Sequence, residues 1–108
     1  MNYEQFFIKL RTNFEHGLEL MKRKNHDYAG VSDPFKNFRA SEMLGLTVED
    51  GILVRMSDKL SRAANLLKMK INDDQDVRVK EESIKDTLTD LMNYANILAI
   101  YLEYGEKQ

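Results

Sequence analysis

Residues 84–102, IKDTLTDLMNYANILAIYL, decide the fold of this chain. Apolar residues recur in this stretch at alternating spacings of four and three positions: Ile84, Leu88, Leu91, Ala95, Leu98 and Leu102. Such a heptad-like repeat predicts a long helix with an apolar seam that packs against another helix. We expect this helix to cover about residues 79–103 and to end at Gly105, because glycine favours helix termination.

Helical periodicity is also present in two segments that precede this stretch. Residues 3–24 and about 48–70 each carry an apolar stripe at helical spacing, and Thr47 with Asp50 resembles a capping box before the second of these helices. A short helix over about residues 37–44 is expected to end at Gly45. No segment alternates as a strand does, so the sequence predicts an all-α bundle of three long helices and one short helix in a single domain, residues 1–108.

Composition excludes several classes of protein. The chain has 108 residues, a formal net charge of −2, one Pro and no Cys. The weakly acidic balance argues against DNA or RNA as a partner, because nucleic-acid binding needs a basic surface. We expect no membrane partner, signal peptide or anchor, since no stretch is long and apolar enough. The absence of Cys excludes disulfides and thiolate metal sites and suits a cytoplasmic location.

Four polar residues of the third long helix share one band about 80° wide: Glu82, Asp86, Asp90 and Asn93. An exposed acidic face is one interpretation of this band. However, the band continues as Ile97 and Ile100, which a fully solvated face does not normally do. We therefore expect this face to enter a second packed environment, either a cavity or a subunit interface, where carboxylates need cation partners.

The second long helix carries a complementary band of Arg55, Asp58, Lys59 and Arg62. One interpretation is an exposed face with an Asp58–Arg62 ion pair, which contributes about 0.2–0.5 kcal/mol. The other is a functional site, in which Asp58 joins a magnesium site while the cations neutralise phosphate oxygens.

A loop over residues 25–39 is rich in aromatic and polar side chains. Tyr28, Phe35 and Phe38 are candidates to sandwich a nucleobase, with Asn25 or Asn37 hydrogen-bonding to its edge. Alternatively, the three aromatic rings fill the end of the bundle, because aromatic side chains bury large areas wherever they lie.

These residues resemble motifs of the all-α nucleoside triphosphate pyrophosphohydrolases, the MazG-like superfamily. The resemblance is greatest to its small phage-associated members, described as nucleotide-modification-associated domains. Residues 86–99, DTLTDLMNYANILA, resemble the third-helix pattern of the family, and residues 55–62, RMSDKLSR, resemble its basic second-helix run. Residues 24–28, KNHDY, followed by Asn37 and Phe38, are similar to the K-x-x-D-Y…N-F loop of the small members.

The resemblance implies Mg²⁺-dependent cleavage of a nucleoside triphosphate, ribo or deoxy, to monophosphate and pyrophosphate in a homodimer or homotetramer. It implies that Mg²⁺ is held by Asp58, Glu82, Asp86 and Asp90, and that Lys59 assists catalysis. The residues implied to contact the nucleotide are Lys24, Asn25, Asp27, Tyr28, Asn37, Phe38, Arg55, Arg62, Asn93 and Tyr94. The E-x-x-E pair that the family usually has on its second helix is represented here only by Asp58. The alternative function is therefore a sponge or sensor that binds nucleotides without hydrolysing them. An inert helical scaffold is a third possible function.

Overall fold

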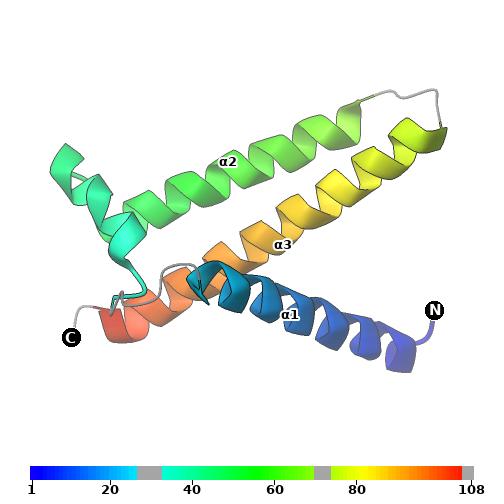
Figure 1. Ribbon diagram of the computed structural model, residues 1–108, viewed down its shortest axis with the longest axis horizontal. Coiled ribbons are helices and arrows are strands. Elements are labelled where there is room, and N and C mark those ends of the chain that lie inside the picture. The colour runs from blue at the N-terminus through cyan, green and yellow to red at the C-terminus, as the bar shows by residue number, and fades with distance from the viewer. Residues whose placement is uncertain (27–32, 70–73, 106–108) are drawn as a thin grey trace. The chain divides into compact units, whose positions relative to one another are not determined.

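The computed structural model describes residues 1–26, 33–69 and 74–105. Within these ranges the chain forms helices and no strand: α1 (Tyr3–His26), the 3-10 helix η1 (Lys36–Leu44), α2 (Val48–Lys68) and α3 (Asp74–Tyr104) (Figure 1). The all-α class is therefore confirmed, with three long helices and one short one. The chain divides into two compact units, Met1–Ser32 and Asp33–Gln108, which are described separately. None of the described helices has the length and apolar character needed to cross a membrane.

The first unit is built on α1, which starts at a reciprocal cap. The side-chain oxygen of Asn2 accepts a hydrogen bond from the Gln5 backbone N–H at 2.8 Å, and the Gln5 side chain accepts one from the Asn2 N–H at 3.0 Å. This pairing satisfies backbone donors that the first helical turn leaves without an intrahelical partner. The Tyr3 and Phe7 rings stack along the helix with centroids 6.2 Å apart.

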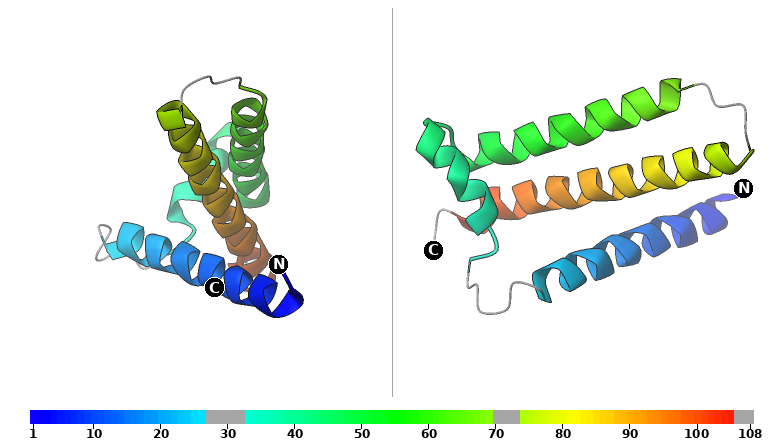
Figure 2. Two further views of the ribbon diagram at one scale, coloured as in Figure 1. Left: turned by 90° about the vertical axis from the view of Figure 1, so that its right-hand side faces the viewer. Right: turned by 45° about the horizontal axis from the view of Figure 1, so that its top comes forward.

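The second unit is organised by α2 and α3, which run antiparallel and side by side (Figure 2). Helix α3 starts at Asp74, several residues before its expected start, and residues 70–73 lie outside the described part. Lys80 of α3 donates a hydrogen bond to the Met69 carbonyl at 2.6 Å, just past the end of α2. That carbonyl lies where helix termini lack backbone partners, so Lys80 ties the two helices together.

The predicted apolar seams are only half buried in this helix pair. Leu88 and Leu102 of the α3 seam are 48% and 67% exposed, and Leu60 and Leu67 of the predicted α2 seam are 60% and 65% exposed. Instead, α3 packs through a face that carries Thr87, Tyr94 and Tyr101 at a spacing of seven residues. The expectation that the aliphatic seam forms the main contact was therefore wrong for Leu88 and Leu102, whereas Leu98 of the same seam packs against the core. Aromatic rings contribute much of the buried area on this face, and the buried Thr87 hydroxyl is satisfied within α3, where it donates to the Ser83 carbonyl at 2.7 Å.

Helix η1 closes the end of this pair, and its own ends are well defined. The predicted stop at Gly45 is confirmed: its φ of 77° is left-handed, and its N–H donates to the Glu42 carbonyl at 3.1 Å. The predicted capping box at the start of α2 is confirmed too, with the Asp50 N–H donating to the Thr47 hydroxyl at 3.1 Å. Gly51 lets η1 approach α2 closely, because a Cβ there would lie 2.7 Å from Ser41 Oγ.

The core lies where η1, α2 and α3 meet. It consists of five buried side chains: Phe35, Phe38, Val48, Ile52 and Tyr101. Two edge-to-face ring pairs join η1 and the residue before it to α3, Phe35 with Tyr101 at 5.1 Å and Phe38 with Tyr94 at 6.0 Å between centroids. Such pairs contribute about 0.5–1.5 kcal/mol each beyond their buried area.

Candidate functional site

An ion pair links the two charged bands that the sequence singles out. Lys59 Nζ of α2 lies 3.0 Å from Asp90 Oδ2 of α3, and the two side chains are 29% and 25% exposed. Partial burial reduces solvent screening, so this pair is stronger than one on an open surface. It joins the two helices at this level and places the Asp90 carboxylate against Lys59.

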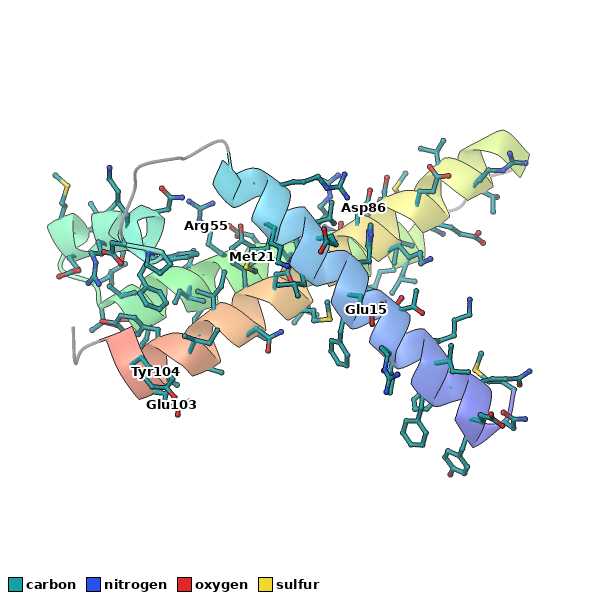
Figure 3. The ribbon with its side chains drawn as sticks, turned by 60° about the horizontal axis from the view of Figure 1, so that its bottom comes forward. Glu15, Met21, Arg55, Asp86, Glu103 and Tyr104 are labelled. Atoms are coloured by element: carbon teal, nitrogen blue, oxygen red, sulfur yellow. The ribbon has the colours of Figure 1, made fainter. Side chains whose placement is uncertain are left out.

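The same ion pair defines one charged side of the α2–α3 pair. Arg55, Asp58 and Arg62 follow one another at steps of three and four, so they form a single row along α2, with Lys59 at its edge. Because Lys59 borders this row and Asp90 belongs to the α3 band, both bands lie on the same side of the helix pair. We call this surface the charged side (Figure 3 labels Arg55 and Asp86 on it).

The antiparallel register sets which residues of the charged side lie opposite one another. Since Lys59 is level with Asp90, Arg62 lies near the level of Asp86, and Arg55 lies near the level of Asn93. Arg55, Arg62 and Asp86 are exposed, whereas Asn93 is half-buried. The charged side therefore offers guanidinium groups along one edge and carboxylates along the other.

The four predicted magnesium ligands do not gather into one cluster. Asp58, Glu82 and Asp86 are exposed, and Asp90 contacts Lys59. In the described part of the chain, no group of three or more His, Asp or Glu side chains is placed to hold a metal ion. Likewise, Asp58 and Arg62 do not form the ion pair that the i, i+4 spacing allowed; the ion pairs of α2 within residues 48–68 involve Lys59 alone.

A pocket of about 230 Å³ lies between η1 and the first half of α2. Its lining is predominantly apolar, with the polar side chains of Asn37, Ser41 and Arg55 at intervals. Three of the predicted nucleotide-binding residues, Asn37, Phe38 and Arg55, thus border one cavity. The other residues of its wall are Ala40, Leu44, Leu46, Gly51 and Val54.

The aromatic residues of the predicted loop have different surroundings. Phe35 and Phe38 are buried in the core, as in the interpretation that the rings fill the end of the bundle, although Phe38 also borders the pocket. Tyr94 is half-buried and packs its ring against Phe38. Asp27, Tyr28 and the side chain of Asn25 lie outside the described residues, and the exposed Lys24 belongs to the first unit.

One titratable pair stabilises the entry to η1. The Asp33 carboxylate accepts hydrogen bonds from Arg39 Nε and from the Phe35 N–H. The Arg39 bond, followed by the backbone bond, lowers the pKa of Asp33 below its usual value, and the same bond raises the pKa of Arg39. The pair holds η1 at the end of α3, where Phe35 meets Tyr101.

Six pocket residues escaped the sequence reasoning: Ala40, Ser41, Leu44, Leu46, Gly51 and Val54. Leu44 and Leu46 lie in or just after the short helix η1, where periodicity is too brief to show which face is hollowed. A usable signal was Gly51 in the first turns of α2, because a glycine inside a helix often marks a close backbone approach.

Comparison of the chain with models of protein families, with curated proteins and with solved structures finds no match.

Proposed function

We propose that this protein hydrolyses a ribo- or deoxyribonucleoside triphosphate, supplied with Mg²⁺, to the monophosphate and pyrophosphate. The observation that carries the proposal is the charged side of the α2–α3 pair. There, the Lys59–Asp90 ion pair brings a row of guanidinium groups and a band of carboxylates onto one surface. Guanidinium groups bind phosphate oxygens, and carboxylates bind the cation that accompanies them.

The residues present suit a magnesium ion that arrives with its nucleotide. Mg²⁺ usually keeps several waters and is held by one or two carboxylates together with substrate phosphates, so it does not require a three-carboxylate cage. Asp86 and Asp58 are exposed carboxylates on the two helices and are the best candidates to hold it, with Glu82 and Asp90 beside them. When bound, the ion supplies Lewis acidity to the phosphates and lowers the pKa of a bound water.

The cations of α2 supply the protein's own contribution to the reaction. Arg55 and Arg62 neutralise charge that develops on the phosphate oxygens while water attacks and pyrophosphate leaves, which is the largest catalytic effect in such reactions. Lys59 keeps the Asp90 carboxylate at one position, so that a ligand meets a preorganised acidic edge.

The experiment that tests this proposal is a pyrophosphate-release assay over the four NTPs and four dNTPs with Mg²⁺. Asp86→Asn and Asp90→Asn are each expected to lower turnover by at least about 100-fold, because an amide is nearly isosteric with a carboxylate but binds Mg²⁺ poorly. Glu103→Gln, an exposed carboxylate of α3 outside the charged side, is the matched control and should retain full turnover. Undiminished turnover in both Asp variants would show that the assigned carboxylates are wrong.

The Lys59–Asp90 contact also favours a second candidate function, nucleotide binding without hydrolysis. A carboxylate that is already neutralised by an ammonium is less available to a metal ion. A sponge or sensor of this kind would still gain thermal stability from nucleotides, because a ligand that binds only the folded state raises its stability. A thermal shift without turnover would support nucleotide binding without hydrolysis. The absence of a shift with any nucleotide would support the inert helical scaffold instead.

We further propose that the protein assembles as a homodimer or homotetramer through the side of the helix pair opposite the charged side. Leucines recur there at a spacing of seven on α2, as Leu53, Leu60 and Leu67, which are 48%, 60% and 65% exposed. On α3, Leu88 and Leu102 are exposed as well. Large exposed apolar patches of this kind are typical of interfaces, and the heptad spacing suits a second helical pair.

A further inference from the structure

We propose that the pocket between η1 and α2 is the subsite for the nucleobase, and that the phosphates run from it along α2 from Arg55 toward Arg62. This inference rests on the proposed function, because it takes a nucleotide as the ligand. It names the part of the molecule that recognises the base and sets the direction in which the nucleotide lies.

The size and lining of the pocket suit a flat ring. Its volume is about 230 Å³, and an apolar cavity of roughly 150 Å³ already holds a benzene molecule. Leu44, Leu46 and Val54 offer apolar contacts to a ring face and are 79%, 43% and 52% exposed. The Asn37 amide, which carries both a donor and an acceptor, borders the same cavity and is suited to the edge of a base.

The row of charged residues on α2 starts at the wall of the pocket, and this arrangement points to a nucleotide as the ligand. Arg55 belongs both to the wall of the pocket and to the row on α2. Gly51, Arg55, Asp58 and Arg62 follow at steps of four, three and four, so the row starts at the pocket wall. From Arg55 to Arg62 the helix rises about 10 Å, which separates two cations along an extended chain of phosphates.

Asp58 lies between the two arginines of this row. A carboxylate at that point would repel bare phosphates, but it would attract a divalent cation bound to them. The order of groups along α2 is therefore an apolar pocket, a cation, a carboxylate and a second cation. That order complements a base followed by a magnesium-bound polyphosphate, and it does not suit an apolar peptide or a lipid tail.

The test compares ligands with and without a base on the whole chain. Isothermal titration is performed with dATP, dCTP, dGTP and dTTP, each with Mg²⁺, and with tripolyphosphate and Mg²⁺ as the base-free probe. Val54→Phe, which adds a ring at the pocket wall from an exposed position, should weaken the best nucleotide by at least about tenfold, the scale of a pocket contact, and leave tripolyphosphate binding unchanged. Arg62→Gln should weaken both ligands.

A second measurement keeps the inference independent of any one variant. The methyl resonances of Leu44, Leu46 and Val54 should shift with the nucleotide and not with tripolyphosphate. The inference is overturned if Val54→Phe leaves nucleotide affinity unchanged, or if these methyls shift with protein concentration instead, since a second copy would then occupy the pocket. Base-dependent binding without pyrophosphate release would uphold the subsite and refute hydrolysis, whereas wild-type binding of no nucleotide would refute both.

Discussion

Replacement of Gly51 by Ala probes how closely η1 lies against α2. At an open helical position this substitution stabilises a protein by about 1 kcal/mol, because Ala has the higher helix propensity. At Gly51 the added Cβ would lie 2.7 Å from Ser41 Oγ, 3.0 Å from Ser41 Cβ and 3.3 Å from the Phe38 carbonyl oxygen. The first of these distances is far inside van der Waals contact, so Ser41 must move.

The expected change in the free energy of unfolding is the sum of three contributions, two unfavourable and one favourable. Overpacking costs about 1–3 kcal/mol. Displacement of the Ser41 hydroxyl costs roughly a further 1 kcal/mol, because its single O–H lies within hydrogen-bond distance of two carbonyls, Phe38 at 2.7 Å and Thr47 at 2.9 Å. The gain in helix propensity offsets about 1 kcal/mol. We therefore expect Gly51→Ala to lower the free energy of unfolding by about 1–3 kcal/mol.

Urea unfolding, followed by far-UV circular dichroism, measures this change. Ser41→Gly is the matched background, since it removes both side-chain atoms that the new Cβ would meet. In that background Gly51→Ala should cost at least about 1 kcal/mol less, and the double-mutant cycle isolates the contact. Stabilisation by Gly51→Ala in the wild-type background would refute the close approach of η1 to α2.

Three further outcomes are expected. The pKa of Asp33 is lowered in the folded state, so its contact with Arg39 contributes stability above about pH 4, and this contribution is lost as pH falls through the lowered pKa. In urea titrations, the difference in free energy of unfolding between wild type and Asp33→Asn should therefore narrow on acidification. Lys80→Met should lower the free energy of unfolding by about 1 kcal/mol, because it removes the cation from the C-terminal carbonyls of α2, whereas exposed Lys85→Met should have little effect. Leu60→Gln should shift the protein to monomer in sedimentation velocity without loss of helicity, and an unchanged sedimentation coefficient would contradict the proposed interface.

Most helix positions and ends were predictable because their signals are local, although α3 starts at Asp74, several residues before its expected start. Gly45 stops η1 and the Thr47–Asp50 box starts α2, and both involve residues within a few positions of each other. The face that α3 presents to α2 was predicted only in part: Leu98 of the seam packs against the core, but aliphatic spacing also favoured Leu88 and Leu102, which are exposed. Burial depends on what the neighbouring helix offers, and here it offers Ile52 and a lysine that pairs with a carboxylate.

The features of the candidate site that were predictable from the sequence were likewise the local ones. The sequence indicated two charged bands, and their residue spacing was sufficient to put each on one helical face. It did not indicate that Lys59 and Asp90 meet, because a contact across thirty-one positions of sequence depends on the register of two helices. The pocket was not predicted either: Gly51 signals a close backbone approach, but not that the partner is a short helix or that a hollow forms beside it.

The two sides of the α2–α3 pair would allow one small unit to combine the proposed nucleotide binding with the proposed assembly. A helix pair in water needs only one apolar contact face, yet this pair has a core of aromatic contacts and, beyond it, exposed leucines on one side and charges on the other. If a second copy covers the leucines, the charged side stays open to solvent, where a charged ligand can reach it. The Lys59–Asp90 ion pair lies at the boundary of the core with the charged side, at 29% and 25% exposure. A change in helix register would therefore break this ion pair and displace the guanidinium row relative to the carboxylates, so the packing of the core and the geometry of the proposed nucleotide site are mechanically coupled.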